Sequence, residues 1–404
     1  MAMNKRGKLK PSILLLVIPL FNSCVEEFNV EFETEVLQNI VVIEATLTDE
    51  LKHQIIKISS LDSLNSSGFR NTIDNAKVRV IESEGVTHVF NSVGGGSYRS
   101  QNRFAANVGT LYSLTVEANG SEFVSTKEIL PAKSGIQQLV ARRIINDDGV
   151  DGIGIFINPT ANDESPKFRY EFMETYEIIA PLWIGRDMVV TNREFPFEFD
   201  LVPRDRNTRR CFSSNTSTGI ILSSDVDFEN GMEEDFLVHF IRSDNPVIRN
   251  RYSILVEQYS QNSLAQSFYR LLREQSTSEN VFSQIQPGFI EGNIRNMDES
   301  GNRVIGFFSV ESVVSERIFF DYEDFYAGEE LPPYFINCSF FGAPQARTLA
   351  ATSPLLDIID TGDYVYVKNN EGEVPEGGPF LIARRPCGDC TALGSNIVPE
   401  FWEE

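Results

Sequence analysis

Catalytic motifs are what this sequence lacks most clearly. Its 404 residues include only three histidines, and none of them belongs to an HExxH zinc motif. No GxSxG nucleophile elbow and no phosphate-binding P-loop occurs either. We therefore expect His53, His88 and His239 to be structural or simply exposed, and we expect no metal site, no cofactor and no enzymatic activity.

Positive charge is also scarce. There are 35 lysines and arginines against 58 aspartates and glutamates, which leaves a formal net charge of −23. A chain this acidic is repelled by nucleic acid and by anionic surfaces, so we exclude nucleic acid as a partner. The acidity does not indicate disorder, because 41% of the residues are hydrophobic and provide ample apolar area to bury.

No hydrophobic run is long enough to span a bilayer, which requires about 20 apolar residues. The short apolar run at residues 13–20 follows the basic segment 5–10 and precedes Phe21-Asn22-Ser23-Cys24. This order is typical of an export signal, and its end resembles a bacterial lipobox. We expect residues 1–23 to be removed and Cys24 to carry the lipid anchor. The alternatives are an ordinary secretory signal and an N-terminal helix with a chance cysteine.

The first residues after Cys24 are unusually acidic, with five glutamates within residues 24–35. This stretch resembles the surface-export signal of Bacteroidota lipoproteins, which implies a lipid-anchored location in the outer membrane facing the cell exterior. A solvated acidic tether without a signal function is the alternative interpretation.

Four cysteines remain: Cys211, Cys338, Cys387 and Cys390. An even number in an exported chain favours disulfides, and three pairings are possible. The spacing of Cys387 and Cys390 also fits half of a zinc site or a redox motif, but no helical pattern surrounds it. We favour structural disulfides in which Cys387 and Cys390 pair outward with Cys211 and Cys338 and hold the C-terminal tail.

The hydrophobic pattern predicts a mainly β fold. Residues 36–131 contain short alternating segments separated by glycine and asparagine turns, such as residues 76–81 and 110–116. Many short strands at this spacing predict an immunoglobulin-like or transthyretin-like β-sandwich. A proline- and glycine-containing junction at residues 131–135 separates this domain from the rest of the chain.

Residues 136–404 are predicted to form a second β-rich, sandwich-like domain. Its clearest strand signal is residues 168–172, with aromatic residues on one face. One helix is expected at about 262–275, because its apolar residues recur at helical spacing and Asn262 or Ser263 provides an N-cap. The end of the chain, beyond about residue 324, is expected to be a loop-rich tail pinned by disulfides.

Several strings, in this order and spacing, resemble a known family. They are residues 174–177, 252–259, 292–294, 304–309, 387–390 and 399–402. The chain is similar in these strings to Bacteroidota outer-membrane lipoproteins catalogued as domain of unknown function 4249. The resemblance implies a context rather than a reaction, because such lipoproteins accompany TonB-dependent transporters.

The leading hypothesis is therefore a non-catalytic surface lipoprotein that captures a nutrient for a TonB-dependent outer-membrane transporter. Abundant carboxylates keep a second hypothesis open, a surface hydrolase that uses two of them. A third is an adhesion or structural module made of sandwiches. Asp62-Ser63-Leu64 also matches a short pattern at which Bacteroidota glycosylate exported proteins, so Ser63 is a possible O-glycosylation site, although a three-residue match arises easily by chance.

Overall fold

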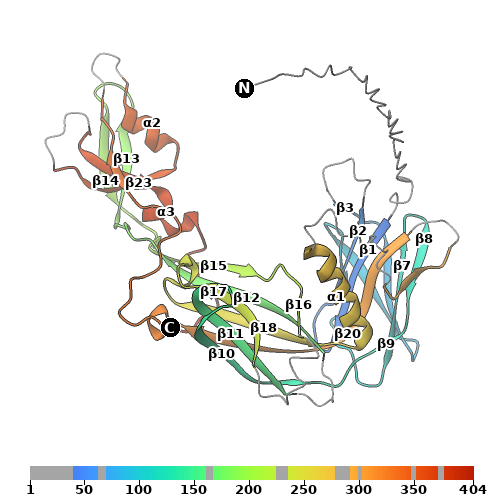
Figure 1. Ribbon diagram of the computed structural model, residues 1–404. Coiled ribbons are helices and arrows are strands. Elements are labelled where there is room, and N and C mark those ends of the chain that lie inside the picture. Colours follow the sequence, from blue (N-terminus) through green and yellow to red (C-terminus); the bar gives the residue numbers. More distant parts are fainter. Residues whose placement is uncertain are drawn as a thin grey trace, which may run out of the picture.

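The structure is a computed structural model that describes residues 40–61, 70–160, 167–223, 235–277, 292–298, 303–346, 352–371 and 377–404. Strands dominate these residues, as the hydrophobic pattern predicts, and they form the three units seen in Figure 1. The predicted signal peptide, the lipid-bearing Cys24, the acidic tether and Ser63 lie outside the described residues.

One long strand, β20 (Arg303–Phe320), joins the first two units. Its first half pairs in parallel with β1 (Ile40–Thr48), up to the pair of Thr48 with Glu311. Its second half pairs antiparallel with β18 (Tyr252–Ser260), beginning at Ser312. The strand passes from one unit to the other in Figure 1 without a break, so the two units share a continuous hydrogen-bonded sheet.

The first unit is a β-sandwich built around residues 40–130. From β20 the strands are arranged in the order β1, β2, β6, β5, β4, β7, β8 and β19, with β3 beside β2 and β9 beside β7. Their bounds are β2 Ile55–Leu61, β3 Arg70–Thr72, β4 Lys77–Glu82, β5 Thr87–Gly94, β6 Ser97–Ser100, β7 Leu111–Ala118, β8 Ser121–Ser125, β9 Glu128–Ile129 and β19 Ile294–Asn296. Alternate side chains, such as Ile43 and Leu47 of β1, point into one apolar core.

A side chain closes this sheet on itself. The Asn293 amide donates to the Phe308 carbonyl and accepts from the Phe308 N–H, both at 2.8 Å. It therefore takes the place of a backbone strand between β19 and β20. Gly292 is needed beside it, because a Cβ there would lie 1.6 Å from the Gly306 carbonyl oxygen.

The predicted domain boundary is wrong for part of the chain. Residues 292–298 and the first half of β20 were assigned to the second domain, but Ile294, Val304 and Phe308 lie in the core of the first. The reason is that β1 and β8 each need another neighbour to satisfy their backbone groups. That neighbour comes from more than 150 residues away, which no local pattern reveals.

The second unit is also a two-sheet sandwich. One sheet contains β10 (Gly135–Ile145), β11 (Asp151–Thr160) and β17 (Phe236–Arg242). The other sheet contains β12 (Phe168–Ile179), β15 (Arg210–Thr216) and β16 (Ile221–Leu222) together with β18 and β20. Its strand order is β15, β12, β18, β20, with β16 beside β12. Isoleucines of β11 face aromatic and aliphatic residues of β12 and β18 across the core, as in other sandwiches.

The predicted helix is confirmed as α1, Ser263–Thr277. Asn262 is its N-cap, since its side-chain oxygen accepts the Ala265 N–H at 2.8 Å. Ala265 and Phe268 pack against Phe307 of β20, and the Phe268 and Phe307 rings lie 5.3 Å apart. The helix therefore covers β20 where it leaves the first unit.

The loop-rich tail contributes to a third small unit that has its own core. The strands are β13 (Arg186–Asn192), β14 (Glu198–Pro203), β21 (Phe340–Gly342), β22 (Tyr364–Asn369) and β23 (Phe380–Arg384), and the helices are α2 (Pro354–Asp360) and α3 (Arg385–Gly388). Phe199 of the β13–β14 hairpin, Leu355 of α2 and Ile382 of β23 pack together. The hairpin comes from between β12 and β15, so neither segment contains the whole core, and each segment alone resembles loop sequence.

Two disulfides hold this third unit in place. Cys211 of β15 is bonded to Cys390, and Cys338 is bonded to Cys387. This is the outward pairing favoured from the sequence. The first bond attaches the end of the third unit to the second sandwich, whose core includes both of its cysteines. The second bond lies within the third unit and fixes α3 against the segment before β21.

We expect the two disulfides to have separable effects. Replacing Cys211 and Cys390 by serine removes the attachment to the second sandwich and should cost about 2–5 kcal/mol of stability, measured by denaturant unfolding. Replacing Cys338 and Cys387 should instead produce an early, separate transition of the third unit. Mass spectrometry after alkylation of the denatured, unreduced protein should find none of these four thiols modified, and modification of any pair would contradict the pairing.

Candidate functional site

A polar groove lies where the first two units meet. Its volume is about 400 Å³, within the range of small-molecule sites. Strands β1, β2, β12 and β18 and the turn between β1 and β2 supply its lining, which comprises Glu44, Ala45, Thr46, Thr48, Lys52, His53, Gln54, Ile55, Lys57, Arg169, Glu171 and Tyr259. Strand β20 and helix α1 lie behind it and position the two walls.

A buried ion pair forms the base of the groove. Arg169 of β12 is only 8% exposed and Glu311 of β20 is fully buried. The guanidinium donates to Glu311 at 3.0 Å and also to Glu171. The second oxygen of Glu311 accepts from the Gln261 amide at 2.8 Å. Burial alone would lower the pKa of Arg169, but the negative charges of Glu311 and Glu171 outweigh it and raise that pKa.

Two tyrosines enclose this guanidinium. Its central carbon lies 4.1 Å from the Tyr259 ring centre and 5.1 Å from that of Tyr269 on α1, which is cation–π geometry. Burial, and then the nearby Glu311 charge, raise the pKa of Tyr269. Burial and the Glu171 charge also raise the pKa of Tyr259. Both hydroxyls therefore stay protonated at neutral pH.

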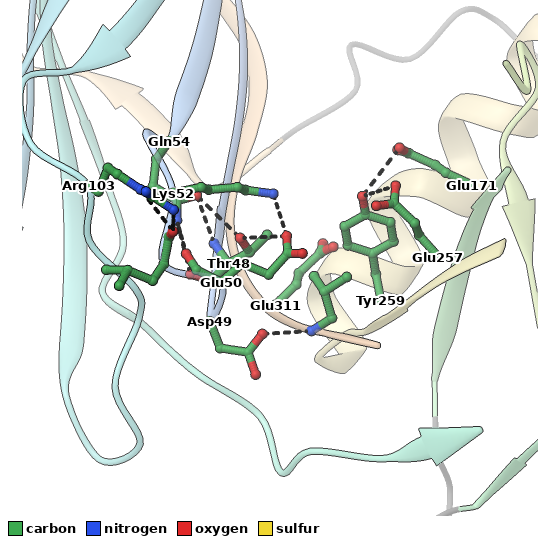
Figure 2. A network of polar contacts seen from close by, with 12 residues as sticks. Thr48, Asp49, Glu50, Lys52, Gln54, Arg103, Glu171, Glu257, Tyr259 and Glu311 are labelled. Carbon is green, nitrogen blue, oxygen red and sulfur yellow. Dashed lines mark hydrogen bonds and ion pairs between the residues drawn. The ribbon is translucent and has the colours of Figure 1, made fainter. Parts of the chain in front are cut away.

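Two carboxylates share the Tyr259 hydroxyl. Glu171 and Glu257 face each other directly on neighbouring strands β12 and β18, and the hydroxyl lies 3.4 Å and 3.1 Å from their oxygens. Like charges opposite each other destabilise a sheet, and one hydroxyl has only one proton to donate. The second unit therefore presents excess negative charge to the groove, as Figure 2 shows on its right-hand side.

The facing side belongs to β1 and β2 of the first unit (Figure 2). Gln54 is buried and donates to the backbone carbonyls of Thr48, Glu50 and Phe104, which fixes the turn between these strands. Lys52 pairs with Glu50 at the rim.

His53 adds a ring to this side of the groove. Its Nδ1 lies 2.8 Å from the carbonyl oxygen of Ser100. Because a carbonyl only accepts, Nδ1 carries a proton and donates it to this oxygen.

Further contacts fix the angle between the two units. Asp49 accepts from the Val313 N–H at 2.9 Å and from the Ser312 hydroxyl at 3.0 Å, just beyond the point where β20 changes partner. Buried Glu128 of β9 accepts from Asn262 at 2.7 Å and from Asn293 at 2.8 Å. One carboxylate thus ties together the helix N-cap of the second unit and the sheet closure of the first.

This arrangement is suited to binding rather than to proton transfer. Arg169 stays protonated at any accessible pH, and the raised pKa values of Tyr259 and Tyr269 keep both as neutral hydrogen-bond donors. A general acid or base needs a pKa near the working pH, which none of these three groups has.

The two-carboxylate hypothesis requires a carboxyl group of raised pKa in the second unit, and Glu174 is a buried carboxylate there. It accepts from Tyr252 at 2.7 Å and from Asn215 at 2.9 Å, and His239 lies 3.7 Å away. Burial would raise the pKa of Glu174, but the nearby His239 and the hydrogen bonds from Asn215 and Tyr252 together lower it. Glu174 is therefore a stabilised carboxylate, the opposite of a general acid.

The three histidines lie apart. His88 stacks on Phe104 with ring centres 3.6 Å apart and contacts Glu82 at 2.7 Å, while His239 lies beside Glu174 and His53 lines the groove. Among the residues that the structure describes, no group of three or more His, Cys, Asp or Glu could hold a metal ion. No helix in that part of the chain is long and apolar enough to cross a membrane.

Sequence reasoning missed most of this site. Of Arg169, Glu311 and Tyr259, only Arg169 lay in a predicted strand, residues 168–172, and nothing marked the three residues as partners. One local signal was present: Arg169 interrupts an aromatic-rich strand, and a charge on a strand with this much apolar surface requires a buried partner or an exposed face.

The fold and the groove define a multi-unit β-sandwich protein with a polar site between two sandwiches. Comparison with known families is more specific, because the chain belongs to the family described as Domain of unknown function (DUF4249), which matches residues 25–317. The family resemblance in the sequence is thereby confirmed. The matched region contains the groove and ends just before the third unit's tail segment.

Other comparisons add little. No curated protein matches the chain. Among solved structures, a DUF4785 family protein from Legionella pneumophila is similar at 6% identity and a TM-score of 0.16, covering 54% of this chain and 51% of its own. The chain thus spans about half of that protein, and a likeness at this level carries no argument.

The buried ion pair can be tested by a double-mutant cycle. Arg169→Met leaves Glu311 buried without its cation and should cost about 3–5 kcal/mol of stability in urea unfolding. Arg169→Met combined with Glu311→Leu removes both charges and should recover much of that loss. Glu311→Leu alone completes the cycle, and a loss in the double variant equal to the sum of the two single losses would show that the two charges are not coupled.

Glu174 should contribute stability that depends on pH. Because its pKa is lower in the folded protein than the usual 4.5, its contribution is present above that value and is lost as the pH falls through the folded-state pKa. Glu174→Gln should be less stable than the wild type at pH 7 by about 1–3 kcal/mol. The difference in unfolding free energy should narrow towards pH 3.5, whereas exposed Glu84→Gln should show a constant difference.

Proposed function

We propose that this protein is a non-catalytic, lipid-anchored binding protein of the outer cell surface, which captures a ligand for a TonB-dependent transporter. The observation that carries the proposal is the groove between two sandwiches that β20 holds at a fixed angle. Its polar lining is rich in hydrogen-bonding groups, and its buried Arg169 and Tyr259 are suited to binding rather than to proton transfer.

The anchoring part of the proposal rests on the sequence. The basic segment, short apolar run and Ser23-Cys24 have the order of a lipoprotein signal, and several acyl chains on one cysteine make membrane attachment effectively permanent. The acidic residues after Cys24 favour the outer face.

The transporter is the proposed partner because of the family context. The lipoproteins that this chain resembles accompany such transporters, and the chain belongs to the same family. The fixed angle between the sandwiches supports this role, since a rigid surface loses little conformational entropy when a partner docks on it.

Purification from native membranes tests the proposal. The protein, tagged after Glu404 through a flexible linker, is extracted in detergent without crosslinker, and its companions are identified by mass spectrometry. We expect a TonB-dependent transporter in comparable amount. Cys24→Ser should shift the protein out of the membrane fraction and abolish incorporation of labelled fatty acid. Membrane-bound protein recovered without any transporter would contradict the proposed partnership.

A further inference from the structure

Charged side chains of both signs line the groove, with two lysines on the first unit facing Glu171 on the second. On the first unit, Lys52 of the turn between β1 and β2 and Lys57 of β2 supply cations, and Ile55 between them is 41% exposed. On the second unit, Glu171 supplies a carboxylate whose side chain is 47% exposed, and Glu257 lies behind it across Tyr259.

Further groups complete the lining. Glu44 lies on the floor, opposite Lys57 in the register of β1 and β2. His53 lies on the same wall as the lysines, and the Thr46 hydroxyl on the floor. The lining therefore offers both hydrogen-bond donors and acceptors.

These opposite charges do not neutralise each other across the groove. Of the ion pairs among the described residues, those of Glu171 and Lys52 stay on their own walls, with Arg169 and with Glu50. Closing the groove is prevented by β20, which continues through both sheets, and by the buried Arg169–Glu311 pair at its crossing point. Although both are paired, the side chains of Glu171 and Lys52 remain 47% and 44% exposed, so a ligand in the groove can contact both walls.

We infer that the groove binds a zwitterionic ligand, a short peptide with free amino and carboxyl termini. The peptide ammonium group pairs with the carboxylate wall at Glu171, and the peptide carboxylate pairs with Lys52 and Lys57. Exposed Ile55 provides a contact for a small apolar side chain. A purely anionic ligand would meet Glu171 and Glu44, and a purely cationic one would meet the lysines, so neither matches the lining.

The size of the groove agrees with this ligand class. A volume of about 400 Å³ lies towards the lower end of small-molecule sites, which suits a peptide of a few small residues rather than a polymer. The inference rests on the proposed capture role and names the class of compound that would be captured.

The test is calorimetric titration of the intact, tagged protein in detergent, with trialanine as the probe. Trialanine should bind, and its N-acetylated and C-amidated forms should each bind at least ~10-fold more weakly, because each lacks one charge-assisted contact. Equal binding of the capped and free peptides would overturn the inference, as would no binding of trialanine.

Matched variants separate this ligand from a simple anion. Both Glu171→Gln and the double variant Lys52→Gln/Lys57→Gln should weaken trialanine binding roughly ten-fold or more, while the exposed controls Glu84→Gln and Lys127→Gln should leave it unchanged. If Glu171→Gln strengthened binding while the lysine variant weakened it, the site would recognise an anion and the inference would be wrong.

The peptide-binding test and the transporter purification can fail independently of each other. Peptide binding by protein that is recovered without a transporter would refute only the proposed partnership. Recovery with a transporter, but without peptide binding, would refute only the ligand class.

Discussion

The structure depends on one strand that belongs to two sheets. Every backbone hydrogen bond that β20 makes with β1 and β18 also constrains the angle between the two sandwiches, because a single strand cannot bend freely without losing part of its ladder. Glu311 and Ser312 lie at the residue pair where the partner changes. The groove exists because the units are held side by side at this point and cannot pack flat against each other.

The buried charges at this point have a cost as well as a benefit. Removing Arg169 and Glu311 from water is expensive, and a well-packed apolar pair could be at least as stable. The charged pair adds a directional constraint. Arg169 contacts Glu311, Glu171 and two tyrosine rings, and all of these contacts form together in only one geometry. We therefore interpret the pair as a device for specificity at the joint, which positions the two walls of the groove.

The accuracy of sequence-based reasoning depended on the range of the interactions involved. The helix at 263–277 and the alternating strands were predictable, because spacing and capping act within a few residues. The disulfide pairing was indicated by cysteine placement. The assignment of β20 to one domain was wrong and the third unit was not predicted, because β1 gains its neighbour, and the third unit its hairpin, from segments more than 100 residues away.

The sequence by itself determined the mainly β class, the family, the helix and the acidic character of the chain, since each depends on composition or on local periodicity. Only the tertiary structure decided where Arg169 finds its carboxylate, 142 residues away, and that Lys52 and Glu171 line one groove without pairing. Such neighbours arise from the order of strands in a sheet. Many orders satisfy the same alternating pattern, so the pattern alone cannot select the one that builds the site.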